Sequence, residues 1–209
     1  MKKEIDREEI FKSVFCLQPT RPILCTTKNE DATDHVAPFS WCVPISTKPP
    51  MLALSLLQTP KKSHSLSNIE RTKEFVINLP DMSLIDDIVL TSYKTKYGEN
   101  KFDRSKFTKM KSKYVKPVCI KECRAHLECK AESIIYPGDH ALIIANIINA
   151  VYDDDAFSDN MLINFRNYKP VIHMHNYPLE NMNSQIHVFL NPVGEIITEV
   201  MYPTKKEQI

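Results

Sequence analysis

The fold is decided by the stretch from Pro19 to Asn78, which contains Ile23-Leu24-Cys25-Thr26-Thr27, His35-Val36-Ala37-Pro38-Phe39-Ser40 and Met51-Leu52-Ala53-Leu54-Ser55-Leu56-Leu57. These runs are short and rich in apolar residues, and turn-forming residues separate them, which is typical of β-strands joined by tight turns. Pro38 places the second run at a sheet edge, a bulge or a strand end, because proline cannot donate to a strand ladder. We expect residues 41–45 to continue that second strand.

A polar cluster, Lys61 to Asn68, follows the third strand. Ser63 or Ser65 is expected to cap a helix that runs to about Arg71, and residues 74–79 form the next strand. Cations and hydroxyls at a helix start suit a phosphate, since free backbone N–H groups and the helix dipole point there. An ordinary capped surface helix explains the same residues equally well.

Further along the chain, strands outnumber helices. We expect two helices, an amphipathic one over residues 3–14 and a second over 83–97, and an irregular basic segment over 101–117. One strand is expected over residues 118–136, and another over 140–151 that is covered on both faces. Short strands are expected near residues 171–173 and 185–190. This order predicts a mainly β fold, a closed or partly closed barrel with peripheral helices. No linker divides it, so residues 1–209 are expected to form a single domain with its core at about 15–180.

Composition excludes several function classes. The chain has 209 residues, a net charge of +1 and three glycines, with no GxGxxG or GxxxxGK motif, so it is not a Rossmann or P-loop protein. The balanced charge predicts neither nucleic acid nor membrane as a partner. Its six cysteines form no CxxC pair, and residues 1–9 lack the apolar segment of a signal peptide. A cytoplasmic protein with reduced thiols is therefore expected.

Several motifs occur in the order that is typical of one family. They are Arg21-Pro22 with Thr26-Thr27, His35-Val-Ala-Pro-Phe-Ser40, Pro49-Pro50 to Ser55, Ser65-Leu-Ser-Asn-Ile69, Glu74-Phe-Val-Ile-Asn78, Gly138-Asp139-His140 and the closing segment 165–177. In that family they read PRP…TT, NxAPxS, PPxxxxS, DTxxNI, EFVxN and GDH. The chain thus resembles the flavin reductase-like family, including flavoredoxins and ferric reductases, whose fold is an FMN-binding split barrel of Greek-key type.

The resemblance implies an FMN-binding oxidoreductase and a homodimer. Hydride from NAD(P)H would pass through the flavin to free flavin, ferric iron or a protein. The implied cofactor-binding residues are Thr27, Ala37, Pro38, Phe39, Ser40, Trp41, Cys42, Ser55, Lys62, Ser65 and Asn78. His140 would stand on the nicotinamide or substrate side as the catalytic residue. The alternatives are an FMN-binding electron carrier without a nicotinamide site, and a structural domain without flavin.

The chain also departs from the family pattern. His35 stands where the family has asparagine, and His64-Ser65 replaces its usual Asp-Thr. The closing segment reads His173-Met-His-Asn-Tyr177 and lacks the family's glycines. These changes leave the electron donor and acceptor more open than the flavin.

Three other groups of residues are candidate metal sites. In the first, His173 and His175 share a strand face, with His187 downstream. In the second, Cys119, Cys123 and Cys129 share strand parity, which His126 among them does not. The third is the carboxylate run Asp153-Asp154-Asp155. Surface or pocket histidines, small buried cysteines and a solvated turn are the simpler explanations. The sequence therefore predicts no metal site.

Overall fold

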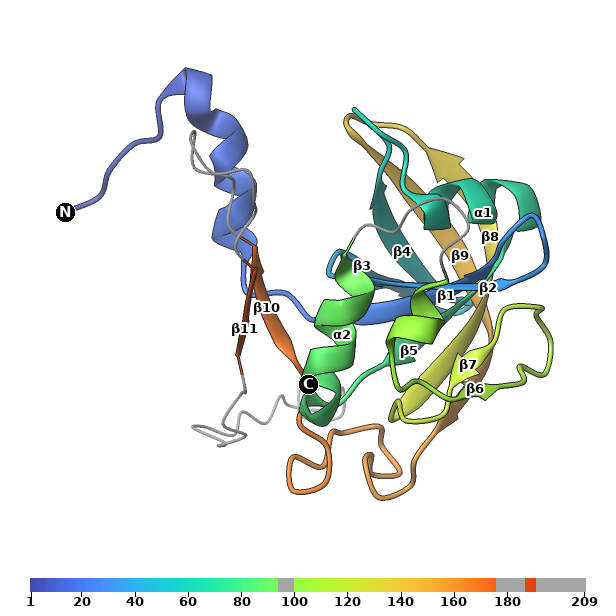
Figure 1. The fold of residues 1–209 in the computed structure, drawn as a ribbon. Helices are drawn as coiled ribbons and strands as arrows, with labels where there is room; N and C mark the ends of the chain where they lie inside the picture. The colour runs from blue at the N-terminus through green and yellow to red at the C-terminus, as the bar shows by residue number, and fades with distance from the viewer. Residues whose placement is uncertain (94–99, 176–186, 191–209) are drawn as a thin grey trace, which may run out of the picture.

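Seven strands form one curled sheet in a computed structural model of the chain, which describes residues 1–93, 100–175 and 187–190 (Figure 1). Their order across the sheet is β2-β1-β5-β8-β9-β4-β3. The strands are β1 (Ile23–Lys28), β2 (Asp34–Phe39), β3 (Cys42–Thr47), β4 (Pro50–Leu57), β5 (Glu74–Leu79), β8 (Ala125–Ile135) and β9 (His140–Tyr152). All neighbouring pairs are antiparallel. The expected mainly β architecture is confirmed.

The chain connection between β2 and β3 explains why the sheet curls. These two strands lie at opposite ends of the sheet order, yet only Ser40 and Trp41 separate them. Three residue steps span at most about 11 Å, so the two sheet edges must meet at this point. The edges do not pair with each other, which leaves a split barrel. Residues 41–45 thus do not continue β2 as expected, because the chain changes direction and β3 pairs with β4 instead.

The barrel interior holds the main core. Leu54, Phe75, Ile77 and Ile143 are nearly or completely buried there, and side chains from β1, β8 and helix α1 (His64–Thr72) join them. Ser63 caps α1 by accepting from the Leu66 N–H at 3.2 Å, as one of the two expected caps. The helix closes one end of the barrel with Leu66 and Ile69, whose burial contributes about 1.5–3 kcal/mol each.

A second core covers the outer face of β1 and β2. Leu24 and Val36 point away from the barrel interior and pack with Ile88, Phe102 and Phe107. These partners come from a peripheral layer: η2 (Met82–Leu84), α2 (Ile85–Ser92), η3 (Lys101–Arg104), β6 (Lys109–Met110) and β7 (Cys119–Ile120). The helix expected over residues 83–97 is thus a short 3-10 turn followed by α2, and residues 94–97 lie outside the described part.

Two expected strands differ from the structure. Residues 118–136 form β7 and β8 rather than one strand, because the chain turns at Lys121–Arg124. The strand β9 is not covered on both faces at its carboxyl end, where Ile148, Val151 and Tyr152 are exposed. The expectation that residues 140–151 are covered on both faces is therefore wrong at this end of the strand.

An N-terminal arm stands beside the barrel together with a two-stranded ribbon (Figure 1). The arm is η1 (Arg7–Leu17), a 3-10 helix in which no residue is buried, and the ribbon pairs β10 (Ile172–His175) with β11 (His187–Leu190). Backbone hydrogen bonds between Thr20 and His173, of 2.8 and 3.0 Å, join the two. Among the described helices, none is long and apolar enough to cross a membrane. A single domain over residues 1–209 stays a prediction.

Candidate functional site

The segment from Ala37 to Cys42 lies where the two sheet edges meet. Ala37 is nearly buried on β2, whereas Trp41 is 39% exposed in the connection to β3. The Ser55 N–H on β4 donates to the Trp41 carbonyl at 2.9 Å and fixes the bend. Pro38, Phe39, Ser40 and Cys42 are each half-buried. The segment therefore presents backbone and partly covered side chains along one surface.

His140 reaches this same surface from a distant part of the chain. It begins β9, where it pairs in register with Leu57, the last residue of β4. Its ring lies 4.8 Å from the Trp41 ring, centroid to centroid, at an interplanar angle of 36°. The carboxylate of Asp139 lies 2.8 Å from Nδ1 of His140 and orients the imidazole. Two predicted site residues almost a hundred positions apart are thus in contact.

His173 also contacts this segment. Its Nδ1 lies 2.7 Å from the Ser40 hydroxyl, and the ring is buried. Nearby, burial raises the pKa of the Cys42 thiol to about 12, although the positive charge of Arg21 opposes this. Cys42 is therefore a neutral thiol. The sequence did not connect His173 with Ser40, because β10 lies far along the chain and only the folded ribbon brings them together.

The start of α1 offers unused hydrogen-bonding capacity. The N–H groups of a helix's first turn lack acceptors within the helix. Ser65 is buried, and its hydroxyl has no hydrogen-bond partner in the described part of the chain. A buried hydroxyl without a partner is costly unless a ligand or water satisfies it. This arrangement fits an anionic group such as the phosphate of FMN.

Thr27 lies beside this helix start. It is completely buried at the end of β1, and its hydroxyl accepts from the Asn68 side-chain amide at 3.0 Å. The same amide donates to the Asn29 side-chain oxygen at 2.9 Å. Asn68 therefore ties α1 to the β1–β2 turn and fixes the position of Thr27.

The side chains of Lys62 and Asn78 make contacts with other residues of the chain. The Lys62 ammonium lies 2.7 Å from Glu70, which also accepts from the Tyr136 hydroxyl at 2.7 Å.

Asn78 is buried on the outer face of β5. Its amide donates to the Leu24 carbonyl at 3.0 Å and its oxygen accepts from the Ile120 N–H at 2.9 Å. Asn78 thus anchors β7 to the barrel, and its contact with a cofactor stays a prediction, as does that of Lys62.

Two of the departures from the family pattern are in contact. The rings of His35 on β2 and His64 on α1 lie 4.5 Å apart at an angle of 43°. Burial, with the charges of His64 and Lys101, lowers the pKa of His35 to about 3. Burial and Lys101 also lower the pKa of His64, which Asp31 partly opposes. Both rings are therefore mainly neutral at pH 7.

Among the described residues, no three histidine, cysteine or carboxylate side chains are grouped to hold a metal ion. Cys119, Cys123 and Cys129 do not share one strand but belong to three separate apolar clusters. Asp153 and Asp155 each pair with Arg124, at 2.9 and 2.5 Å. The side chains of His175 and His187 lie outside the described part.

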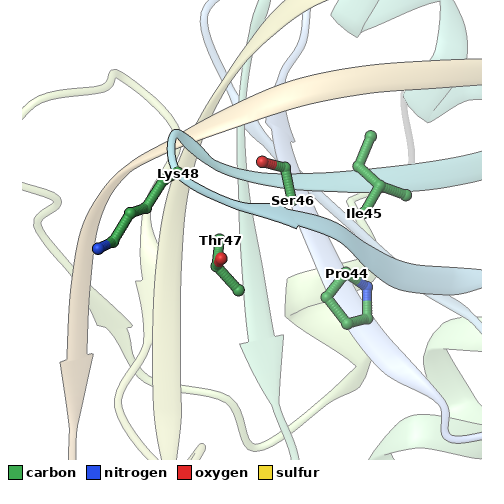
Figure 2. Close-up of a pocket in the computed structure, with 5 residues that line it drawn as sticks. All are labelled: Pro44, Ile45, Ser46, Thr47 and Lys48. Atoms are coloured by element: carbon green, nitrogen blue, oxygen red, sulfur yellow. The ribbon is translucent and has the colours of Figure 1, made fainter. Parts of the chain in front are cut away.

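A shallow hollow lies at the β3–β4 hairpin and is lined by residues 44–48 (Figure 2). Its lining begins at Pro44, two residues after Cys42, and ends at Lys48, its one titratable residue. None of residues 37–42 lines it.

Comparison with known proteins extends this picture. A family model described as flavin reductase like domain matches residues 17–171. An uncharacterized protein of Archaeoglobus fulgidus is 32% identical over 167 residues, which cover 80% of this chain and 90% of that one. An uncharacterized protein of Aquifex aeolicus is 27% identical over 172 residues, covering 81% and 88%.

Solved structures share the fold at low identity. Component B of nitrilotriacetate monooxygenase from Bacillus cereus matches with a TM-score of 0.79 at 18% identity, covering 94% of this chain and 99% of that one. Flavoredoxin of Desulfovibrio vulgaris matches with a TM-score of 0.73 at 20% identity, covering 95% and 97%. The FMN-binding protein of Thermus thermophilus matches with a TM-score of 0.73 at 11% identity, covering 95% and 100%. Since the family model spans most of the chain and these structures share its split barrel, the protein belongs to the flavin reductase-like family.

Proposed function

We propose that the protein is an FMN-binding oxidoreductase that takes hydride from NAD(P)H and passes electrons to free flavin, ferric iron or a protein. The cofactor supplies the redox chemistry when it is bound, so the chain needs only to bind, orient and shield it. One observation carries the proposal: Trp41 and His140, which the family pattern assigns to the flavin and to the nicotinamide side, lie 4.8 Å apart.

The residues divide into two ends of one site. The backbone of residues 37–42 would border the isoalloxazine ring, with Thr27 and Ser55 beside it. Ser65 would bind the phosphate at the start of α1, and Lys62 would join it by exchanging its contact with Glu70. His140, oriented by Asp139, would position the nicotinamide or hold a proton near it. Asn78 would act from behind the sheet by fixing β1 and β5.

We also propose a cytoplasmic homodimer in which the second copy covers part of this site. On η1, Phe11 and Leu17 are 46% and 81% exposed, and on the edge strand β3, Val43 and Ile45 are 54% and 48% exposed. Exposed apolar side chains on the arm and on a sheet edge favour the association of two copies of the chain. Light scattering should give twice the chain mass, and Ile45→Asp should shift it toward one chain mass.

The visible spectrum before and after anaerobic addition of NADH tests the proposed activity. Bound flavin should absorb near about 450 nm and bleach with NADH. His140→Ala should keep the flavin spectrum but slow the bleaching by about a hundredfold or more, the range that is typical for loss of one general acid or base. Flavin that stays oxidised with both NADH and NADPH would instead make the protein an electron carrier. A protein that binds no FMN would refute both functions.

A further inference from the structure

The stacked histidines are the least expected feature of the proposed phosphate end. His64 is the first residue of α1 and is exposed, while His35 lies 4% exposed beneath it on β2. Neither ring makes a hydrogen bond to another described residue, and the two ring centroids lie 4.5 Å apart. Two imidazoles thus sit together with free ring nitrogens at a helix start, next to the unpartnered Ser65 hydroxyl.

The charges around the pair are mostly positive. Lys101 on η3 is only 8% exposed and donates to the Thr91 carbonyl at 2.7 Å. Burial, with Arg104, lowers the pKa of Lys101 to about 8. Asp31 in the β1–β2 turn is the carboxylate that acts on His64. Burial and mutual repulsion make these basic groups lose their protons more easily. A bound anion would favour their charged forms, so the groups form a suitable anion site.

We propose that His64 and His35, with Lys101 behind them and the Ser65 hydroxyl beside them, form the subsite for the phosphate of FMN, and that binding takes up protons. This rests on the proposed FMN binding and adds two histidines to the phosphate contacts proposed above for Ser65 and Lys62. His35 stays neutral and donates a ring N–H, whereas His64 gains a proton. Lys101 keeps its proton to a higher pH than in the free protein.

The direction of the pH dependence follows from these changes. A dianion raises the pKa values of His64 and Lys101 in the complex above their values in the free protein. Affinity then rises as pH falls, by up to about tenfold per pH unit for each linked proton. The phosphate itself has a second pKa near 6 and remains mainly dianionic above pH 6.5. Riboflavin lacks the phosphate and should bind equally at every pH in this range.

Titration calorimetry of FMN and riboflavin at pH 6.5 and pH 8.5 tests the proposal. We expect FMN to bind about tenfold more tightly at pH 6.5, with proton uptake seen as a dependence of the heat on the buffer's ionisation enthalpy. The double variant His35→Asn/His64→Asp restores the family's residues and should lose the part of the pH dependence that His64 contributes, so that only the part from Lys101 remains. Lys121→Gln, which removes one exposed cation elsewhere, should keep the wild-type pH dependence. Unchanged FMN affinity between the two pH values, or a dependence in the double variant as large as in the wild type, would overturn the proposal.

Inorganic phosphate separates this inference from the proposed function. In NMR spectra of the histidine rings at pH 7, phosphate should shift the His64 and His35 signals saturably, whereas chloride at equal ionic strength should not. If FMN fails to bind but phosphate shifts these signals, the proposed function fails and the anion subsite stands. If FMN binds and phosphate leaves both signals unmoved, the subsite is wrong while the flavin function stands.

Discussion

Glu128→Gln should destabilise the protein by about 3 kcal/mol. Glu128 is 2% exposed on β8, and its carboxylate accepts four hydrogen bonds. Three come from the backbone N–H groups of Lys113, Tyr114 and Val115, at 2.8, 2.6 and 3.2 Å, and one from the Asn149 side chain at 2.9 Å. This carboxylate therefore holds the loop before β7 against the barrel.

The magnitude follows from which bonds glutamine can keep. Its carbonyl oxygen replaces one carboxylate oxygen, but its amide group faces two N–H donors where the other oxygen was. Each hydrogen bond to a charged group contributes about 1.5–3 kcal/mol, so losing two of them costs about 3 kcal/mol or more. For a chain of this length that corresponds to a fall in Tm of roughly 10 °C.

Urea denaturation followed by circular dichroism measures the effect. Glu132→Gln is the matched control, since Glu132 is an exposed residue of the same strand with one hydrogen bond, from Asn146 at 2.8 Å. It should change the free energy of unfolding by less than about 0.5 kcal/mol. If Glu128→Gln also stays within that margin, the loop is held by packing alone and the reasoning is refuted.

The same carboxylate predicts a pH dependence. Burial alone would raise the pKa of Glu128, but the hydrogen bonds from Lys113, Tyr114, Asn149 and Val115 outweigh it, and the net pKa is lowered. A group with a lowered pKa in the folded state adds stability above its unfolded pKa, about 4.3, and that stability is lost as pH falls through the folded pKa. The difference between wild type and Glu128→Gln should therefore be full at pH 7 and shrink below about pH 4.

Three further predictions concern the site and the thiols. FMN should strongly quench the emission of Trp41, the only tryptophan, and unchanged emission at saturating FMN would place Trp41 outside the site. Ser65→Ala should lower the affinity for FMN by about tenfold, measured by calorimetry, because a hydrogen bond to a charged group is lost, and should leave the affinity for riboflavin unchanged. Equal losses of affinity for both ligands would show that Ser65 does not bind the phosphate. Cys16, the exposed thiol, should react rapidly with a thiol reagent in the native protein, whereas Cys25 should react only after denaturation, since burial raises its pKa.

The sequence predicted best what depends on neighbouring residues. The strands at residues 23–27, 51–57 and 74–79 and the cap at Ser63 are confirmed, because alternation, turn residues and capping hydroxyls act over a few positions. The division of β8 into two faces was also predictable: Leu127 and Cys129 pack in the barrel core, and Lys130 is exposed.

What covers each face could not be predicted in the same way. Alternation along the strand places Glu128 on the face opposite Leu127 and Cys129, and it does lie on that outer face, yet it is buried. The reason is that residues 113–115, more than ten positions earlier, lay their N–H groups over it. The arrangement is set by where the chain turns at residues 121–124, and that turn was missed because Cys119 and Cys123 fit the alternation of a single long strand.

The histidine pair shows how the two kinds of information combine. From the sequence, His35 and His64 were two separate departures from a family pattern, 29 positions apart. In the fold they are one contact, because the strand β2 lies under the start of α1, and the two changes therefore act on a single place in the site. Replacing an amide and a carboxylate by two imidazoles removes a negative charge from this place and gives it a histidine, His64, whose protonation a bound anion can favour. A change of that kind alters how an anion is held without altering the barrel, which is why the family and fold were predictable from the motifs while this property required the structure.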